Sequence, residues 1–219
     1  MPTFNTDMVR DHFVITENGR RILVDTGCPI IITSESRGQM EQNFLADARR
    51  HVAPDIAEIR GMAYLTQHKV LFDYENAQVV IADPQDDIPV DTVAEFDMKN
   101  VPGRIVFDVN IGGTVRTMIF DTGASITDYI SESIARTGMF FDTAQDFHPD
   151  PRLGKYTVER FALPIQIGSD TFHIPFGIQP AEVEPHVRAA GANGVIGVGL
   201  YKKYKVLLDF RGRKMILGR

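Results

Sequence analysis

The chain has 219 residues, which is long enough for one large domain or two small lobes. Its composition is that of an ordinary globular protein, and its net charge of −6 gives no general electrostatic reason to bind nucleic acid or an anionic membrane. Cys28 is the single cysteine, which excludes an intrachain disulfide. With neither a signal peptide nor a membrane-spanning run recognisable, we expect a soluble, cytoplasmic protein.

Two β-hairpins are predicted, one near the start of each half of the chain. The run HFVITENGRRILV contains two strand-like stretches joined by Asn18-Gly19, a dipeptide that tolerates positive φ at both turn positions. The run GRIVFDVNIGGTVRTMIF repeats this plan with Gly112-Gly113 at the turn. In each hairpin the second strand leads directly into Asp-Thr-Gly, at 25–27 and at 121–123.

A second repeat ends each half, where the segment 58–81 resembles the segment 194–217. Five residue identities occur in the same order at a constant offset of 136 positions, which predicts an internal duplication. The matching pairs are Gly61 and Gly197, Lys69 and Lys205, Val70 and Val206, Leu71 and Leu207, and Asp73 and Asp209.

The middles of the two halves differ. In the first half, apolar residues spaced by four predict a helix within 34–52: Met40, Phe44 and Ala48, with Leu45 beside them. The second half holds about 40 additional residues, roughly 140–180. They contain strand-like runs at 155–168 and 171–178, preceded by a Pro- and Asp-rich segment at 142–154 that is typical of turns.

These patterns divide the chain into an N-terminal lobe (1–82), a connection (83–103) and a C-terminal lobe (104–219). The connection is rich in Pro and Asp, and we interpret it as exposed. A cation site there is disfavoured because its acids have no regular ligand spacing. The histidines show no metal-ligand spacing either, so no metal or organic cofactor is predicted.

One Asp-Thr-Gly is a weak signal, since it also suits an ordinary turn at the end of a strand. Two copies, each after an apolar strand, indicate a functional site instead of an ordinary turn. If the lobes pack about a pseudo-two-fold axis, Asp25 and Asp121 meet at their interface. Two adjacent carboxyls share a proton, so one can take a proton from water while the other donates to a carbonyl oxygen.

On these motifs the sequence resembles the retropepsin-like and pepsin-like aspartic proteases. The second half carries FDTGAS and Val195-Ile196-Gly197, similar to an apolar-apolar-Gly brace of that family, and the first half carries VDTGC and Ile59-Arg60-Gly61. The resemblance implies an all-β, two-lobed acid-protease fold with short helices and pseudo-two-fold symmetry. It also implies these site residues: catalytic Asp25 and Asp121; loop residues Thr26, Gly27, Cys28, Thr122, Gly123 and Ala124; and brace residues Gly61 and Gly197.

The resemblance further implies a β-hairpin flap over the bound peptide. Room for a flap exists only in the second half, at 145–157, where Gly154 and Tyr156 are its candidate substrate-binding residues. Tyr156 as a plain strand residue is an equal alternative.

The chain departs from the family pattern after each tripeptide. Pepsins usually have Ser or Thr there, whose hydroxyl bonds the carboxylate, whereas this chain has Cys28 and Ala124. We therefore expect a dyad that works nearer neutral pH than pepsin does. Cys28 as a nucleophile is a disfavoured alternative, because no histidine has a suggestive local relation to it.

The predicted function is an aspartic endopeptidase, acting as a monomer on an extended peptide or protein substrate. Two alternatives stay open. The first is a catalytically inactive module of the same fold that binds a peptide or protein, favoured by Arg60 and Cys28. The second is a homodimer whose dyad comes from two copies of Asp121. The glycine-rich run at 191–199 is not read as a phosphate loop, because it lacks the Lys-Ser/Thr that should follow.

Overall fold

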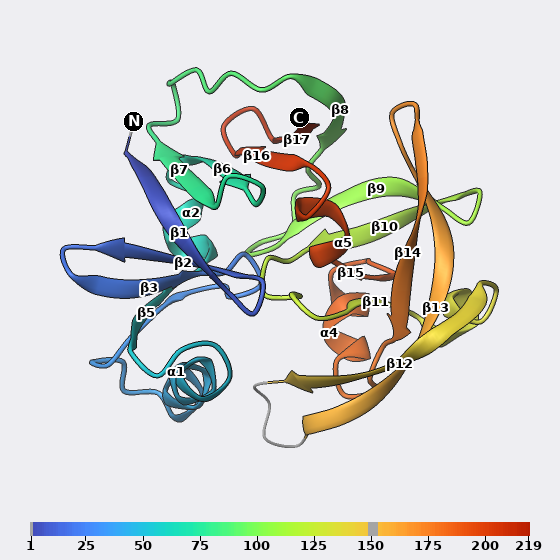
Figure 1. Cartoon of the computed structure of the whole chain (residues 1–219), viewed down its shortest axis with the longest axis horizontal. Helices are drawn as coiled ribbons and strands as arrows, with labels where there is room; N and C mark the ends of the chain where they lie inside the picture. The colour runs from blue at the N-terminus through green and yellow to red at the C-terminus, as the bar shows by residue number, and fades with distance from the viewer. Residues whose placement is uncertain (1, 149–152) are drawn as a thin grey trace.

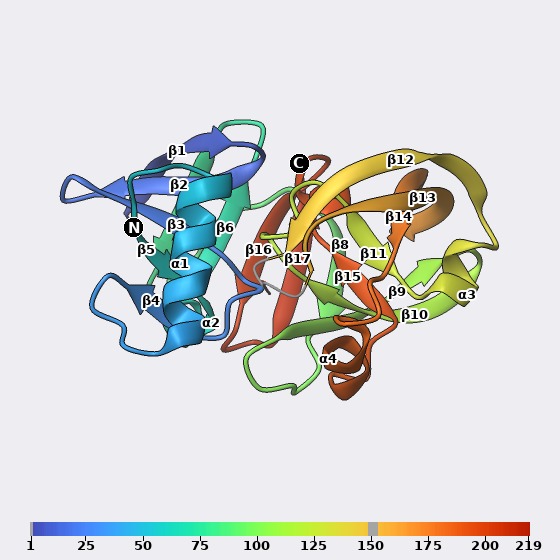
Figure 2. The ribbon, with the colours of Figure 1, turned by 90° about the horizontal axis from the view of Figure 1, so that it is seen from below.

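Two β-sheets dominate the protein, for which a computed structural model describes residues 2–148 and 153–219 (Figures 1 and 2). The first half contributes β1 (Thr3–Val9), β2 (His12–Glu17), β3 (Arg20–Val24), β4 (Ile31–Thr33), α1 (Gln39–His51), β5 (Ile56–Arg60), α2 (Met62–Leu65), β6 (Lys69–Asp73) and β7 (Gln78–Ala82). The rest of the chain contributes β8 (Thr92–Asp97), β9 (Ile105–Ile111), β10 (Thr114–Phe120), β11 (Asp128–Ile130), α3 (Glu132–Ala135), β12 (Met139–His148), β13 (Gly154–Ile167), β14 (Asp170–Ile178), α4 (Glu184–Ala189), β15 (Gly194–Ile196), α5 (Val198–Tyr201), β16 (Lys205–Asp209) and β17 (Lys214–Gly218).

The two sheets do not follow the two halves of the sequence strictly. The larger sheet has the order β4-β5-β3-β2-β1-β7-β6-β16-β17-β8, so the last strands of the second half extend the sheet of the first. The smaller sheet has the order β12-β13-β14-β11-β15-β10-β9 and contains only second-half strands. The all-β, two-lobed fold with short helices predicted from the sequence is confirmed.

A pseudo-two-fold axis passes between β6 and β16. These strands pair antiparallel, with Leu71 opposite Leu207, so residues matched by the sequence duplication lie opposite each other. Two reciprocal ion pairs flank this point: Lys69 with Asp209 at 3.5 Å, and Lys205 with Asp73 at 3.3 Å. The repeated Lys and Asp residues therefore pair across the junction of the lobes.

Both predicted hairpins form around glycine-containing turns. Asn18 and Gly19 have φ values of 51° and 74° between β2 and β3, and Gly112 and Gly113 have 64° and 76° between β9 and β10. Positive φ at both central positions is what a type I′ turn requires. The helix predicted within 34–52 also forms as α1, with Leu45 and Ala48 buried. Met40 also lies in this helix, but its side chain is 72% exposed.

Two segments are more regular than the sequence indicated. The turn predicted at 142–154 begins as strand, because β12 continues to His148 and pairs along its length with β13. Its tip, 149–152, lies outside the described residues. The connection at 83–103 contains β8, which pairs with β17. The boundaries of the three regions stay a prediction. No helix among the described residues is long and apolar enough to cross a membrane.

Candidate active site

Asp25 and Asp121 each stand at the end of an apolar strand that is held by a parallel neighbour. Asp25 follows β3, and its N–H donates to Arg60 O of β5 at 3.1 Å. Asp121 follows β10, and its N–H donates to Ile196 O of β15 at 3.0 Å. The two aspartates are therefore presented by equivalent strand pairs, one from each half.

The threonines of the two tripeptides bind each other across the lobes. Thr26 N–H donates to Thr122 Oγ1 at 3.0 Å, and Thr122 N–H donates to Thr26 Oγ1 at 2.9 Å. Each hydroxyl then donates to a carbonyl of the opposite half, Thr26 to Phe120 O and Thr122 to Val24 O. Both side chains are fully buried, so this exchange joins the two aspartate loops rigidly.

The glycines of the tripeptides leave the space that the carboxyls occupy. A Cβ on Gly27 would lie 2.2 Å from Asp121 Oδ2, and one on Gly123 would lie 2.9 Å from Asp25 Oδ1. Each glycine N–H also donates at 2.7 Å to the aspartate of its own loop. Any larger residue at Gly27 would push the carboxyls apart.

The carboxyls of Asp25 and Asp121 are within hydrogen-bonding reach of each other. Burial raises the pKa of both, and the charge of Asp25 helps to raise the pKa of Asp121 to about 7. The hydrogen bond between them lowers the pKa of Asp25 and raises that of Asp121, and because two adjacent carboxyls cannot both ionise, the pair shares one proton. Both residues remain partly exposed to solvent.

Arg104 brings a positive charge to this pair, and sequence reasoning missed it. Its Nη1 donates to Gly27 O at 2.6 Å, across the junction of the lobes. Its charge lowers the pKa of both Asp25 and Asp121, against the effect of burial.

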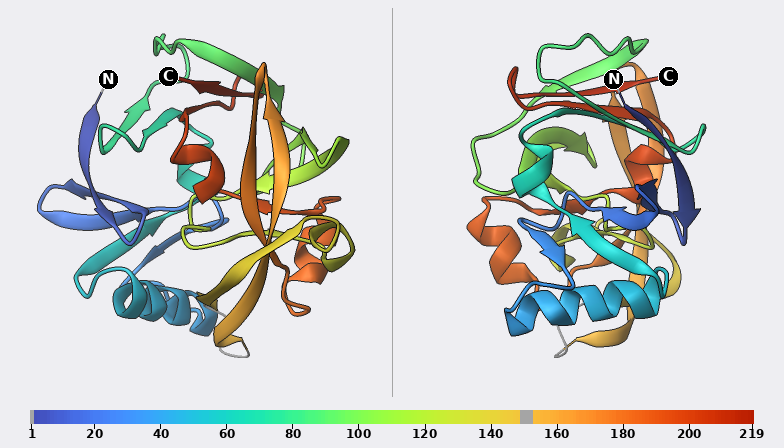
Figure 3. Two further views of the ribbon diagram at one scale, coloured as in Figure 1. Left: turned by 45° about the vertical axis from the view of Figure 1, so that its right-hand side comes forward. Right: turned by 90° about the vertical axis from the view of Figure 1, so that its left-hand side faces the viewer.

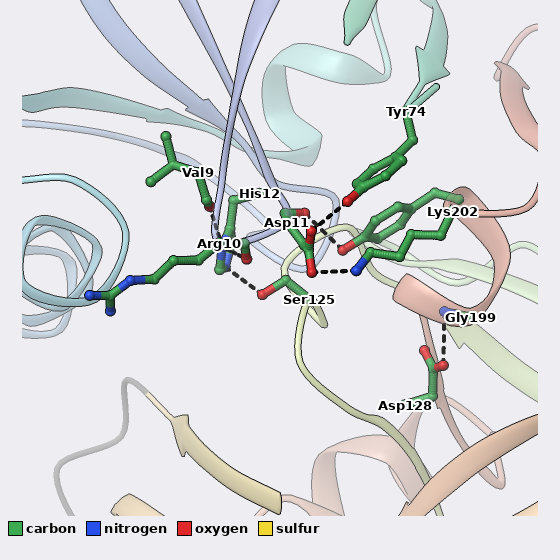
Figure 4. Close-up of polar contacts among 10 residues, drawn as sticks. Val9, Arg10, Asp11, His12, Tyr74, Ser125, Asp128, Gly199 and Lys202 are labelled. Atoms are coloured by element: carbon green, nitrogen blue, oxygen red, sulfur yellow. Dashed lines mark hydrogen bonds and ion pairs between the residues drawn. The ribbon is translucent and has the colours of Figure 1, made fainter. Parts of the chain in front are cut away.

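His12, also missed, occupies the equivalent position in the first half. Two residues before the aspartates stand Ile119 and Leu23, which pair with Val106 and Val14 on the neighbouring strands. Arg104 lies two residues before Val106, and His12 lies two residues before Val14. His12 is buried, and its Nε2 lies 3.2 Å from Ser125 Oγ in the opposite half (Figure 4). A basic residue thus reaches from each half to the opposite aspartate loop.

A polar cluster next to His12 also joins the halves. Asp11 accepts hydrogen bonds from Tyr74 at 2.5 Å and from Lys202, while Tyr201 Oη donates to its carbonyl oxygen at 2.9 Å (Figure 4). Tyr201 and Lys202 come from the end of the second half. The contact fixes the turn that precedes His12.

Cys28 has no role as a thiolate in this geometry. Its Sγ is buried and donates to Ile30 O at 3.3 Å. Burial, with the nearby charge of Asp25, raises the pKa of the thiol to about 12. The buried thiol therefore disfavours the alternative of a nucleophilic cysteine, as the sequence did. The equivalent Ala124 contributes its carbonyl oxygen, which accepts the Val198 N–H at 3.0 Å.

Gly61 and Gly197 lie directly against the two aspartate loops, as the predicted brace requires. A Cβ on Gly61 would lie 2.2 Å from Cys28 O, and one on Gly197 would lie 2.0 Å from Asp121 O. In the second half Asp128 adds to the brace, because its carboxylate accepts the N–H groups of Gly197 and Gly199 (Figure 4). Its position seven residues after Asp121 gave no signal in the sequence.

Arg60 is accommodated in the first brace instead of disrupting it. Its side chain is buried and ion-paired with Glu58 at 2.8 Å and with Glu17. Its guanidinium also lies over the ring of Tyr64, 4.6 Å from the centroid. The carbonyl oxygen of Arg60 still accepts the N–H of Asp25. An arginine in place of an apolar brace residue therefore leaves the first aspartate loop intact.

The predicted flap residues lie on the β12–β13 hairpin. Tyr156 Oη is 2.6 Å from Tyr129 Oη, and Tyr129 also donates to Asp146 of β12. Tyr156 is half-buried and Gly154 opens β13 with φ of 54°. The hairpin is thus tied to the region that follows the second aspartate loop. No cluster of His, Cys, Asp and Glu among the described residues could hold a metal ion.

Comparison with known proteins identifies a fold and no family. None of the protein-family models matches the chain, and no curated protein does. A similar solved structure is the crystal structure of basic 7S globulin from soybean, with a TM-score of 0.50 and 8% sequence identity. The match covers 100% of this chain and 94% of the globulin chain. At this identity the likeness shows the fold alone.

These findings correct the family assignment made from the sequence. The paired tripeptides predicted a retropepsin-like or pepsin-like aspartic protease, yet no family model matches and the similar structure is that of a globulin. The physical reason is that the motifs describe only how two strand-end loops are held together. Proteins that share this fold can hold the two loops together in this way, so the motifs alone identify neither a family nor a function.

Proposed function

We propose that the protein is an aspartic-type endopeptidase that hydrolyses peptide bonds by general acid–base activation of water between Asp25 and Asp121. The observation that carries the proposal is the pairing of these two carboxyls within one chain. Their loops are shaped for this pairing, because any side chain in place of Gly27 would clash with Asp121. Two carboxyls at hydrogen-bonding distance that share one proton supply a base and an acid at the same point.

In the proposed mechanism the ionised Asp25 takes a proton from a water molecule, which then attacks the peptide carbon. Asp121 donates its proton to the carbonyl oxygen, and a gem-diol forms without a covalent bond to the enzyme. Asp25 then gives the proton it took from water to the amide nitrogen, while Asp121 takes a proton back from a hydroxyl of the gem-diol, so that the C–N bond breaks and the starting state of the pair is restored. The peptide lies between the two lobes, under the β12–β13 hairpin. A pKa of about 7 for Asp121 supports activity near neutral pH, since the singly protonated pair then persists to that pH.

A second candidate is a module of the same fold that binds a peptide or protein without cleaving it. The protein with a similar fold is a globulin by name, which gives this candidate its support. The third alternative, a dyad from two copies of Asp121, has less support, because Asp25 already lies beside Asp121 in the same chain.

The test is hydrolysis of casein and of a mixed peptide library between pH 4 and pH 8. Wild-type protein should cleave both, Asp121→Asn should cleave neither while still retaining peptides, and Cys28→Ala should cleave as wild type does. Retention of peptides by wild-type protein with no cleavage at any pH would favour the binding module instead.

A further inference from the structure

The β12–β13 hairpin of the second half lies next to helix α1 of the first (Figures 1 and 3). A cavity of about 300 Å³ lies between these two elements. Its walls come from both lobes. Among the described residues, the cavity is lined by Asp47, Arg50 and His51 of α1, and by His148, Gly154 and Lys155 of the hairpin.

Positive charge gathers around this cavity although the chain as a whole carries a net charge of −6. Burial and the neighbouring charges of Lys155, Arg50 and Arg10 lower the pKa of His51, while Asp47 acts in the opposite direction. Asp47 lies 3.8 Å from Arg50, and it is the one acid among the described residues that line the cavity. Like charges held close together repel, and a bound anion would offset that repulsion.

One contact between the lobes and one within the first lobe hold His51 in place. The ring of Phe147, on β12, stacks on His51 with centroids 4.1 Å apart and an interplanar angle of 22°. Arg10 Nη1 donates to His51 O at 2.7 Å, which anchors the end of α1 to the turn before His12. Arg50 and Lys155 are exposed and keep their charged groups accessible at the rim.

We propose that this cavity is a subsite for an acidic side chain of the peptide that lies between the lobes, the carboxylate of an Asp or Glu residue. Arg50 from one lobe and Lys155 from the other would bind it through charge-assisted hydrogen bonds. The inference depends on the proposed function in one respect, namely that a peptide occupies the space between the lobes. It does not depend on cleavage.

The test measures binding on the full chain carrying Asp25→Asn. Two random decapeptide libraries are passed over this protein, identical except that one contains Glu where the other contains Gln, and the retained peptides are quantified by mass spectrometry. Glu peptides should be retained roughly ten-fold better, as expected for about one charge-assisted contact. Adding Arg50→Glu and Lys155→Glu should abolish or reverse that preference.

The matched control is Arg37→Glu with Arg211→Glu, which changes the net charge equally. Both residues are exposed; Arg37 precedes α1 at its far end, and Arg211 lies in the β16–β17 turn. This control should keep the preference for Glu peptides. Equal retention of both libraries, or the same loss in the control, would overturn the subsite. Preferential retention of Glu peptides with no cleavage by wild-type protein would keep the subsite and reject the peptidase.

Discussion

At the scale of single residues, the site depends on hydrogen bonds that join a residue of one lobe to a residue of the other. Thr26 and Thr122 exchange hydrogen bonds, Arg104 reaches Gly27, and His12 reaches Ser125. None of these contacts closes within one half. The aspartate pair is therefore a property of the junction.

The threonine exchange predicts a measurable coupling. Thr26→Val should lower the free energy of unfolding by about 1–3 kcal/mol, because the buried Thr122 N–H loses its acceptor. Thr122→Val should cost a similar amount. The double variant should cost less than the sum of the two, since both changes break the same exchange. Urea unfolding measures this, with the exposed Thr114→Val as the control; strict additivity would contradict a shared network.

Arg104 predicts a shift in the pH profile of hydrolysis. A positive charge favours ionised carboxyls, so removing it should raise the pKa values of the pair. The alkaline limb of kcat/KM, where the shared proton is lost, starts near the Asp121 pKa of about 7 and should move upward in Arg104→Gln.

The conservative variant Arg104→Lys keeps the charge and should keep the wild-type profile. If activity falls in Arg104→Gln without any movement of the limb, Arg104 acts only by holding the loop of Gly27. The same pKa values can be followed by NMR of the Asp carboxyl carbons, which needs no substrate.

At the scale of elements, the junction of β6 and β16 joins the two lobes through paired strands and reciprocal ion pairs. Asp73 is almost buried, with 7% of its side chain exposed, and Lys205 is its ion-pair partner. Removing that lysine leaves a desolvated carboxylate without its counter-charge.

Lys205→Met should therefore destabilise the protein by about 1–3 kcal/mol at pH 7. The comparison is Lys99→Met, whose pair with Asp108 is about half exposed and should contribute less than about 1 kcal/mol. Chemical denaturation of the two variants checks this difference. Equal costs would show that the ion pair across the lobes adds nothing particular to the junction.

Most elements could be predicted from the sequence, because their signals are local. Turn dipeptides such as Asn18-Gly19, the apolar strands before each aspartate and the spacing of Leu45 and Ala48 act within a few residues. The end of β12 could not be predicted, since Asp and Pro near the hairpin tip resemble a turn. Its strand pairing is decided by the partner β13.

Some residues of the candidate site could likewise be predicted from local sequence signals, and others could not. Asp25, Asp121 and the glycines around them could be predicted because the repeat marks them twice. Arg104 and His12 could not, because their equivalence follows from strand register and their side chains differ.

At the scale of the whole molecule, two halves with different middles share one junction. The first half carries α1 where the second carries the long β12–β13 hairpin, and these two elements meet at the basic cavity. The asymmetry is confined to the periphery, while the aspartate loops and the β6–β16 pair keep the pseudo-two-fold symmetry. Under the proposed function, both halves supply the chemistry and one covers the peptide.

The most direct test of this account is kcat/KM of Asp25→Asn on a peptide that the wild-type protein cleaves, with the exposed Asp87→Asn as the control. If one chain supplies both carboxyls, Asp25→Asn should lose activity by about 10³-fold, because Asp121 cannot act as base and acid at once. The control should retain wild-type activity. Wild-type hydrolysis by Asp25→Asn would contradict the account.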